Sequence, residues 1–308
     1  MSAELDAAGI TDGELRSSYL ECRRLNAEHG KTYFLATRLL PLAKRPYVHA
    51  LYGFARYADE IVDDLSSTLT PEEKRQWLTA WSAGILNDIE AGRSSDAIGM
   101  ALIDTIKRWQ IPHHYFKAFL HSMAMDLTIS EYKTYEALSE YVYGSAAVIG
   151  LEMVHILGVT EPHLFEETLL GAKKLGIAFQ LANFIRDVGE DLERGRIYLP
   201  LDELQQFNID KERLKTRRVN SDLKAALAFQ INRVRELQRE AEITIKNLSP
   251  ESHGCIKAAS ELYCGIVDEV EKIDFQVFTK RAKTSTYRRL KVALPAWWQM
   301  RQASKSRS

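Results

Sequence analysis

The sequence predicts an all-α protein that folds as a single domain. Apolar residues recur at helical spacing, as Leu78, Trp81, Ile85 and Ile89 do in one segment, so that they share one face. Runs that alternate apolar and polar residues, which are typical of strands, are nearly absent. Nothing in the 308 residues marks a linker between two domains. We therefore expect one bundle of helices around a shared core.

The helix boundaries are predicted mainly by the prolines, which mark positions where helices begin or end. The stretch Thr-Pro-Glu-Glu at 70–73 combines an N-cap residue, a proline at the first helical position and a capping-box glutamate. Pro162 opens a segment that runs to about residue 193, and Pro250 opens another that runs to about residue 281. Further junctions are expected at Pro112, Pro200 and Pro295. These signals predict about ten helices, several of them longer than the average of about 11 residues.

Composition and charge describe an ordinary globular protein and exclude several classes of function. Hydrophobic residues make up 45% of the chain and charged residues 27%, which is ample for a core. The formal net charge is −1, so nucleic acid is not an expected partner. Three cysteines, Cys22, Cys255 and Cys264, without Cys-x-x-Cys spacing indicate a reducing compartment. We find no signal peptide and no run of about 18 apolar residues, and therefore expect a cytoplasmic protein.

One stretch places an acidic row among apolar residues. Gln180, Asn183, Asp187 and Asp191 lie at i, i+3, i+7 and i+11, so they share one face of a helix. Apolar residues such as Phe184 stand between them, and carboxylates in such surroundings are costly to bury unless a positive charge neutralises them. Asp187 and Asp191 are one turn apart, close enough to hold a cation between them. The stretch therefore predicts a metal site.

A second stretch repeats this arrangement upstream. Asp59 and Asp63 are also one turn apart, and Arg56 precedes the first of them by three residues. Two such pairs, each with an arginine upstream, predict two facing helices that hold metal ions and an anion. Oxygen ligands without His or Cys favour magnesium or manganese, and magnesium usually binds together with substrate phosphates. A solvated acidic helix face explains one such pair alone, whereas two pairs in apolar surroundings favour the metal site.

Two other motifs point elsewhere but carry less weight. The stretch His-Gly-Lys-Thr at 29–32 resembles the end of a phosphate-binding loop, but Leu25 stands where that motif needs glycine and no strand precedes it. The Gly-x-Gly-x-x-Gly fingerprint of a dinucleotide site is absent. The basic residues from Lys280 to Lys291, followed by Trp297 and Trp298, could touch a membrane surface. A solvated basic helix end is the interpretation that we favour for them.

Four motifs together carry a resemblance to a known family. They are His29-Gly-Lys-Thr-Tyr33, Arg56-Tyr-Ala-Asp59-Glu-Ile-Val-Asp63, Tyr143-Gly-Ser-Ala-Ala-Val-Ile-Gly150 and Gln180-Leu-Ala-Asn183-Phe-Ile-Arg186-Asp187-Val-Gly-Glu-Asp191. In this combination the chain resembles the phytoene/squalene synthase family, and the stretch 194–200 that follows is most similar to its bacterial phytoene synthases. The resemblance covers about residues 18–290, which leaves an N-terminal extension at 1–17 and a basic tail at 291–308 that we expect to be flexible. It implies the single-domain isoprenoid-synthase helical fold, with a central active-site cavity and both aspartate motifs at its mouth.

The resemblance also implies a role for each matching residue. Mg²⁺ or Mn²⁺ is expected to be bound by Asp59, Asp63, Asp187 and Asp191 with the help of Asn183, and to hold the diphosphates of two prenyl substrates. The other substrate-binding residues implied are His29, Gly30, Lys31, Thr32, Tyr33, Tyr52, Arg56, Gln180, Arg186 and Arg196. Besides the four aspartates, the catalytic residues implied are Tyr143 and Tyr263. Aromatic walls would shield an allylic cation from water, although each tyrosine taken alone is better explained as a core residue with a hydrogen-bonded hydroxyl.

The implied reaction is the head-to-head condensation of two geranylgeranyl diphosphates through a cyclopropylcarbinyl (prephytoene) diphosphate. The product would be phytoene, at the first step of carotenoid biosynthesis, and no NAD(P)H would be required. The alternative is a relative that joins two farnesyl diphosphates into dehydrosqualene, squalene or presqualene diphosphate. Thr37, one turn beyond Tyr33, is small and favours the longer substrate, whereas His49, one turn before Tyr52, is not decisive.

Two hypotheses of other classes compete with this one. A head-to-tail prenyltransferase or a terpene cyclase would use similar metal chemistry. The former expects Asp-Asp-x-x-Asp, but Leu65, Ser66 and Ser67 follow Asp63-Asp64 here. A family member without catalytic activity could serve as an assembly factor, since a fold does not determine a function. Such a protein would have no reason to keep both aspartate pairs, and this chain keeps them.

Overall fold

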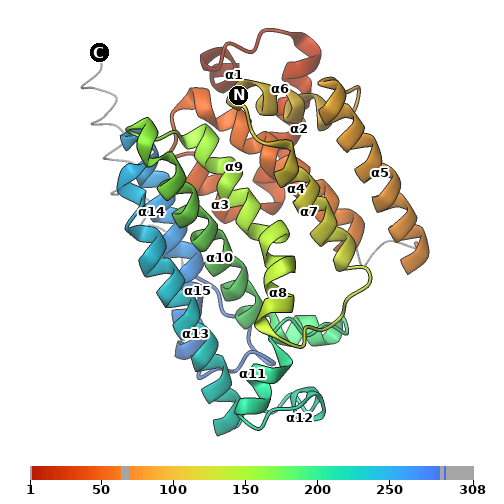
Figure 1. The fold of residues 1–308 in the computed structure, drawn as a ribbon, viewed down its shortest axis with the longest axis vertical. Coiled ribbons are helices and arrows are strands. Elements are labelled where there is room, and N and C mark those ends of the chain that lie inside the picture. The colour runs from red at the N-terminus through yellow and green to blue at the C-terminus, as the bar shows by residue number, and fades with distance from the viewer. Residues whose placement is uncertain (1, 64–68, 285–287, 289–308) are drawn as a thin grey trace.

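A computed structural model describes residues 2–63, 69–284 and 288, and within these ranges the chain is a bundle of helices with two isolated β-bridges and no sheet (Figure 1). The first half contains α1 (Ser2–Ala7), α2 (Gly13–His29), α3 (Lys31–Thr37), η1 (Leu42–Lys44), α4 (Arg45–Asp63), α5 (Pro71–Ala91), α6 (Gly99–Trp109), α7 (His113–Met125) and α8 (Tyr135–Val142). The second half contains η2 (Tyr143–Ala147), α9 (Val148–Leu157), η3 (Pro162–Leu164), α10 (Phe165–Glu193), α11 (Leu201–Gln206), α12 (Lys211–Lys215), α13 (Ser221–Glu242), η4 (Ile245–Asn247), α14 (Pro250–Cys264) and α15 (Ile266–Lys272).

Most of the predicted helix starts are confirmed. The capping box is present at the start of α5. The Glu73 backbone N–H donates to the Thr70 hydroxyl (3.2 Å), and the Glu73 carboxylate accepts a hydrogen bond from the Thr70 backbone N–H (2.7 Å). α7, α11 and α14 begin at the expected prolines or directly after them, whereas Pro295 lies outside the described residues. None of the described helices is both long and apolar enough to cross a membrane.

The predicted helix from residue 250 to about 281 is wrong. α14 ends at Cys264, the short α15 follows, and Asp274 and Phe275 then adopt positive φ angles of 54° and 60°. A helix cannot pass through such residues, so the chain turns there. The estimate of about ten helices is also too low, because short helices such as α1, α3 and α12 carry too few residues for a visible period.

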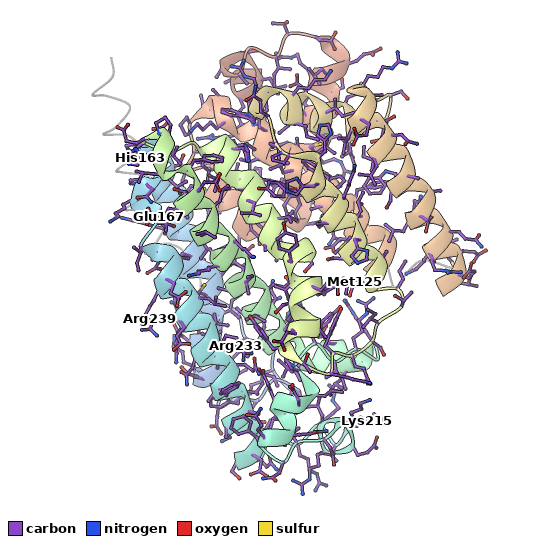
Figure 2. All side chains as sticks on the ribbon, viewed as in Figure 1. Met125, His163, Glu167, Lys215, Arg233 and Arg239 are labelled. Carbon is purple, nitrogen blue, oxygen red and sulfur yellow. The ribbon has the colours of Figure 1, made fainter. Side chains whose placement is uncertain are left out.

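α10 is the central helix of the bundle, and it packs against α9, α13, α14, α15 and η2 (Figure 1). Buried apolar side chains form one cluster around α2, α4, α6 and α7 and a second around α8, α10 and α13. Phe179 and Ile256 pack against both clusters and join them into a single core, as expected for one domain. Long charged side chains such as Lys215 and Arg239 project from the outer surface (Figure 2).

Two glycines let α10 approach η2 and α9 closely. A Cβ atom on Gly176 would lie 2.6 Å from the backbone oxygen of Ala146, and one on Gly150 would lie 2.4 Å from that of Ala172. Real Cβ atoms do not approach backbone oxygens so closely, and a backbone atom cannot rotate away as a flexible side chain can. The crossing of α10 over the preceding helices is therefore possible only with glycine at both positions.

Replacing Gly176 by alanine should lower the free energy of unfolding by about 1–3 kcal/mol, because the added methyl group forces two backbones apart. Gly84 in α5 provides the control, since a Cβ atom there would meet nothing within 4 Å. Gly84→Ala should stabilise the protein by about 0.5–1 kcal/mol through the helix propensity of alanine. Urea unfolding of both variants measures this difference. Equal effects of the two substitutions would contradict the close approach at Gly176.

Candidate active site

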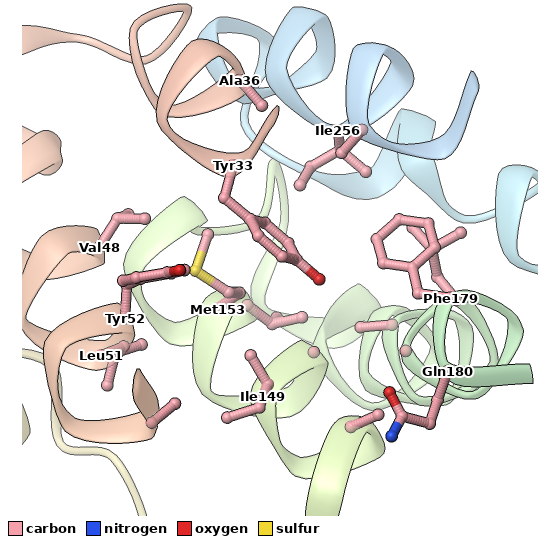
Figure 3. Close-up of a pocket in the computed structure, with 18 of the residues that line it drawn as sticks. Tyr33, Ala36, Val48, Leu51, Tyr52, Ile149, Met153, Phe179, Gln180 and Ile256 are labelled. Atoms are coloured by element: carbon pink, nitrogen blue, oxygen red, sulfur yellow. The ribbon is translucent and has the colours of Figure 1, made fainter. Parts of the chain in front are cut away.

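A cavity of about 360 Å³ runs through the bundle, with walls from α3, α4, α9, α10 and α14 among other elements (Figure 3). Most of its lining is apolar, and Figure 3 shows Ile149, Met153 and Phe179 around the space. The lining on α10 extends from Thr168 to Asn183, a length of about 22 Å at 1.5 Å per residue. The cavity is therefore long enough for an extended hydrocarbon chain.

The first aspartate motif lies on α4 at one end of this cavity. Arg56 and Asp59 both line the space, with 3.9 Å between Arg56 Nη1 and Asp59 Oδ2. Arg56 Nε also donates to Glu60 Oε1 (3.2 Å), and His29 Nε2 lies 3.4 Å from the same oxygen. The predicted phosphate-binding stretch at 29–32 therefore adjoins this motif, at the junction between α2 and α3. Asp63 ends α4, and its side chain lies outside the described residues.

The second aspartate motif lies on α10 and reaches the same end of the cavity. Gln180 and Asn183 line the space, and Figure 3 shows the Gln180 side chain beside it. Asp187, one turn further, is largely buried and lies between two arginines. Arg186 Nε donates to Asp187 Oδ1 at 2.7 Å, and Arg281 reaches both carboxylate oxygens at 3.1 and 3.3 Å. The acidic row is thus neutralised in part by protein cations, as its apolar surroundings require.

The donors gathered here suit a hard divalent cation. Asp59 and Asn183 line the cavity, and the Asn183 side-chain oxygen is buried without a hydrogen-bond partner. Asp187 pairs with Arg186, and Asp191 lines a separate small hollow. A buried amide oxygen left unpaired is costly, and a cation would satisfy it. Within the part of the chain that the structure describes, no three His, Cys, Asp or Glu side chains converge on one point. A Mg²⁺ ion at this end of the cavity would therefore take few ligands from the protein and complete its shell with water and substrate phosphate, as Mg²⁺ commonly does.

Aromatic rings form the wall next to the polar end. Tyr33 stacks on Tyr263 with 4.5 Å between ring centroids, and Tyr263 lies 4.9 Å from Phe179. Tyr52 is tilted against Tyr33 at 6.0 Å. Figure 3 shows Tyr33 pointing into the cavity, which explains why 38% of this interior residue is accessible. Burial raises the pKa of both Tyr33 and Tyr52 to about 12, so both hydroxyls are uncharged near neutral pH.

Several predicted site residues lie apart from the cavity lining. Tyr143 begins the π-helix η2, and its ring lies 5.3 Å from Lys173 Nζ, so its catalytic role stays a prediction. Arg196 donates to the backbone oxygen of Asp126 at 3.2 Å. Thr37 lines the cavity as expected, with its hydroxyl bonded to the backbone oxygen of Tyr33. His49 is buried outside the cavity lining.

Sequence reasoning missed three residues at this site. Tyr141 lines the cavity and donates to Asp126 Oδ2 (2.6 Å), and Tyr198 donates to the other oxygen of Asp126 (2.7 Å). Tyr141 lies in α8, two residues before the motif at 143–150, and residues two positions apart do not share one face of a helix. Arg281 left no signal, because it lies 94 residues from Asp187 in an apparently ordinary basic stretch.

Fold and site together define an all-α protein whose cavity suits a ligand with an anionic head and a long apolar tail. The chain belongs to the squalene/phytoene synthase family, whose model matches residues 26–288. It is 36% identical to the 15-cis-phytoene synthase of Synechococcus elongatus over 284 residues, which cover 90% of this chain and 91% of that protein. It is also 36% identical to a phytoene synthase of Arthrospira platensis over 283 residues, covering 89% of this chain and 90% of that one.

Solved structures support the fold. A dehydrosqualene synthase in complex with ligand superimposes with a TM-score of 0.83 at 24% identity, covering 94% of this chain and 98% of that chain. A squalene synthase from Alicyclobacillus acidocaldarius gives a TM-score of 0.77 at 24% identity, covering 87% of this chain and 98% of that chain. The predicted isoprenoid-synthase helical fold is therefore confirmed.

Replacing Arg281 by glutamine should raise the affinity for Mn²⁺ about two- to fivefold in the absence of diphosphate, because a cation at Asp187 competes with this guanidinium. Arg217→Gln is the matched control. Arg217 pairs at 2.9 Å with Glu193, the last residue of α10, which is the helix that carries Asp187. Calorimetric titration of the two variants and the unmodified protein measures the change. An unaltered affinity in Arg281→Gln would show that Arg281 does not compete with a metal ion at Asp187.

Proposed function

We propose that this protein is a 15-cis-phytoene synthase, a prenyltransferase that joins two geranylgeranyl diphosphates head to head in the presence of Mg²⁺. The observation that carries this proposal is that residues of both acidic motifs, Arg56 and Asp59 on α4 and Gln180 and Asn183 on α10, line one long and mostly apolar cavity. Phytoene synthases similar over nine tenths of the chain support the choice of product. No reductant is needed, because the final carbocation becomes the neutral hydrocarbon by losing a proton.

Substrate binding divides between the two ends of the cavity. Arg56 and Arg186, with the stretch 29–32, supply the positive charge and the hydrogen-bond donors that a diphosphate requires. Asp59, Asp63, Asp187 and Asp191, with the Asn183 oxygen, are the groups that would hold Mg²⁺. When bound, Mg²⁺ neutralises the diphosphate leaving group as the allylic carbon–oxygen bond breaks. The prenyl tails lie in the apolar part of the cavity, where their burial supplies binding energy.

The aromatic wall suits the cation that remains after the diphosphate leaves. The rings of Tyr33, Tyr52 and Phe179 line the cavity, and aromatic rings attract a nearby positive charge to their faces. Tyr33 and Tyr52 keep their protons at working pH, since burial raises the pKa of each to about 12. Their hydroxyls therefore do not act as charged nucleophiles towards the cation. Apolar neighbours such as Met153 keep water away from the cation until a double bond of the second prenyl substrate attacks it.

Activity should require Mg²⁺ or Mn²⁺ and disappear in EDTA. Asp59→Asn and Asp187→Asn should each reduce turnover by about three orders of magnitude, equivalent to about 4 kcal/mol of lost transition-state stabilisation. Asp274→Asn is the control, because Asp274 is an exposed acid paired with Lys224. Turnover assays, with circular dichroism as a check on folding, measure these effects. Near-normal turnover of Asp59→Asn would show that the first motif is only a charged surface and has no role in catalysis.

Chain-length preference should depend on Thr37, which lines the cavity one turn beyond Tyr33. Thr37→Phe should shorten the available space and shift the preference towards farnesyl diphosphate. A misfit of a few methylenes at about 0.8 kcal/mol each is enough to reverse the selectivity. Thr37→Val keeps the volume and is the control. Both substrates are offered together, with and without NADPH, and the hydrocarbons are identified by mass. A thirty-carbon product from the unmodified protein would refute the substrate assignment.

A further inference from the structure

The N-terminal helix α1 carries a buried acid that is connected to the cavity wall. α1 precedes residue 26, where the family match begins. Glu4 is 8% exposed and accepts hydrogen bonds from Arg23 Nε and Arg45 Nη1, both at 3.2 Å. His49 Nε2 lies 3.8 Å from the same carboxylate. One acid on α1 thus meets basic side chains from both α2 and α4.

Arg45 links Glu4 to the segment directly after α3. Its Nε donates to the backbone oxygen of Leu40 at 2.9 Å, and its Nη2 donates to that of Arg38 at 2.7 Å. The three nitrogens of one guanidinium therefore bond Glu4 and two carbonyls directly after the end of α3. α3 carries Tyr33 and Thr37 into the cavity lining.

Arg23 also links Glu4 to α3, through the ring of Phe34. The Arg23 guanidinium lies 5.1 Å above the ring of Phe34, and Phe34 stacks on His49 at 5.6 Å. His49 Nδ1 bonds the side-chain amide of Asn26 at 2.9 Å, and Asn26 lines the cavity. Of the two arginines bonded to Glu4, Arg23 thus contacts α3, and Arg45 contacts the segment directly after it. α3 forms one wall of the cavity.

Removing the charge of Glu4 would leave two largely buried guanidiniums without their acid. The Arg45 side chain is 13% exposed, and a buried charge that loses its partner tends to turn towards water. If Arg45 turns outward, it also releases the carbonyls of Arg38 and Leu40. We propose that Glu4 is a positioning residue that, through Arg45 and Arg23, holds α3 so that Tyr33 and Thr37 keep their places in the prenyl-binding wall. The prenyl-binding role of that wall rests on the proposed function.

The test compares Glu4→Gln with Asp6→Asn in the full chain. Asp6 lies on the same helix, but it is 58% exposed and pairs with Arg16 at 2.8 Å. In Glu4→Gln, hydrogen–deuterium exchange of residues 31–40 should accelerate about tenfold, while exchange in α13 stays unchanged. Asp6→Asn should leave both segments as they are. Unchanged exchange in residues 31–40, or an equal rise in α13, would overturn the proposal.

Kinetics supply a readout that a merely stabilising residue would not change. Glu4→Gln should raise KM for the prenyl diphosphate several-fold with less than about a twofold fall in kcat, because the tail-binding wall loosens while the aspartate motifs stay in place. Equal effects on KM in Asp6→Asn would count against the proposal. If the unmodified protein forms no phytoene, the proposed function fails, but the exchange measurement still decides the role of Glu4.

Arg45→Lys serves as the second variant if Glu4→Gln does not fold. It keeps the positive charge beside Glu4, but a single ammonium lacks the fork that bonds Leu40 and Arg38 at once. The same local acceleration in residues 31–40 is expected for it. Exchange equal to that of the unmodified protein would overturn the proposal.

Discussion

The neutralisation of the acidic row on α10 is the interaction on which the rest of the site depends. Asp187 is 17% exposed at the border of an apolar cavity, where a carboxylate without a counter-charge would be costly. Arg186 comes from the same helix, but Arg281 comes from beyond α15. The chain after α15 must therefore lie against α10, and Gly189 permits this, since a Cβ atom there would be 2.6 Å from the backbone oxygen of Val277.

The width of the cavity follows from how closely α10 packs on its neighbours. Gly150 and Gly176 allow backbone contact with α10 on one side, while the Tyr33 and Tyr263 pair holds α3 against α14 on another. The space left between them is long and apolar, so it suits prenyl tails, and its polar end suits their diphosphates.

Local patterns predicted the helices well and placed Asp187 and Asp191 on one helix, because both depend on residues a few positions apart. The capping box at Thr70 and the one-turn spacing on α10 are of this kind. The same reasoning was weaker for residues facing a cavity. Tyr141 rather than Tyr143 lines the cavity, and residues two positions apart do not share one face of a helix, so a motif that begins at Tyr143 does not reveal Tyr141. His49 proved to face Glu4 and Asn26 instead of the cavity.

The sequence by itself determined the helical class, the main helix starts and the two acidic rows, since each is encoded within one or two turns of a single helix. Only the tertiary structure decided which distant side chains meet those rows. Arg281 reaches Asp187 across 94 residues, and Glu4 reaches Arg45 across 41. Such pairs depend on how whole helices pack against one another, and helix packing leaves no periodic trace in either segment.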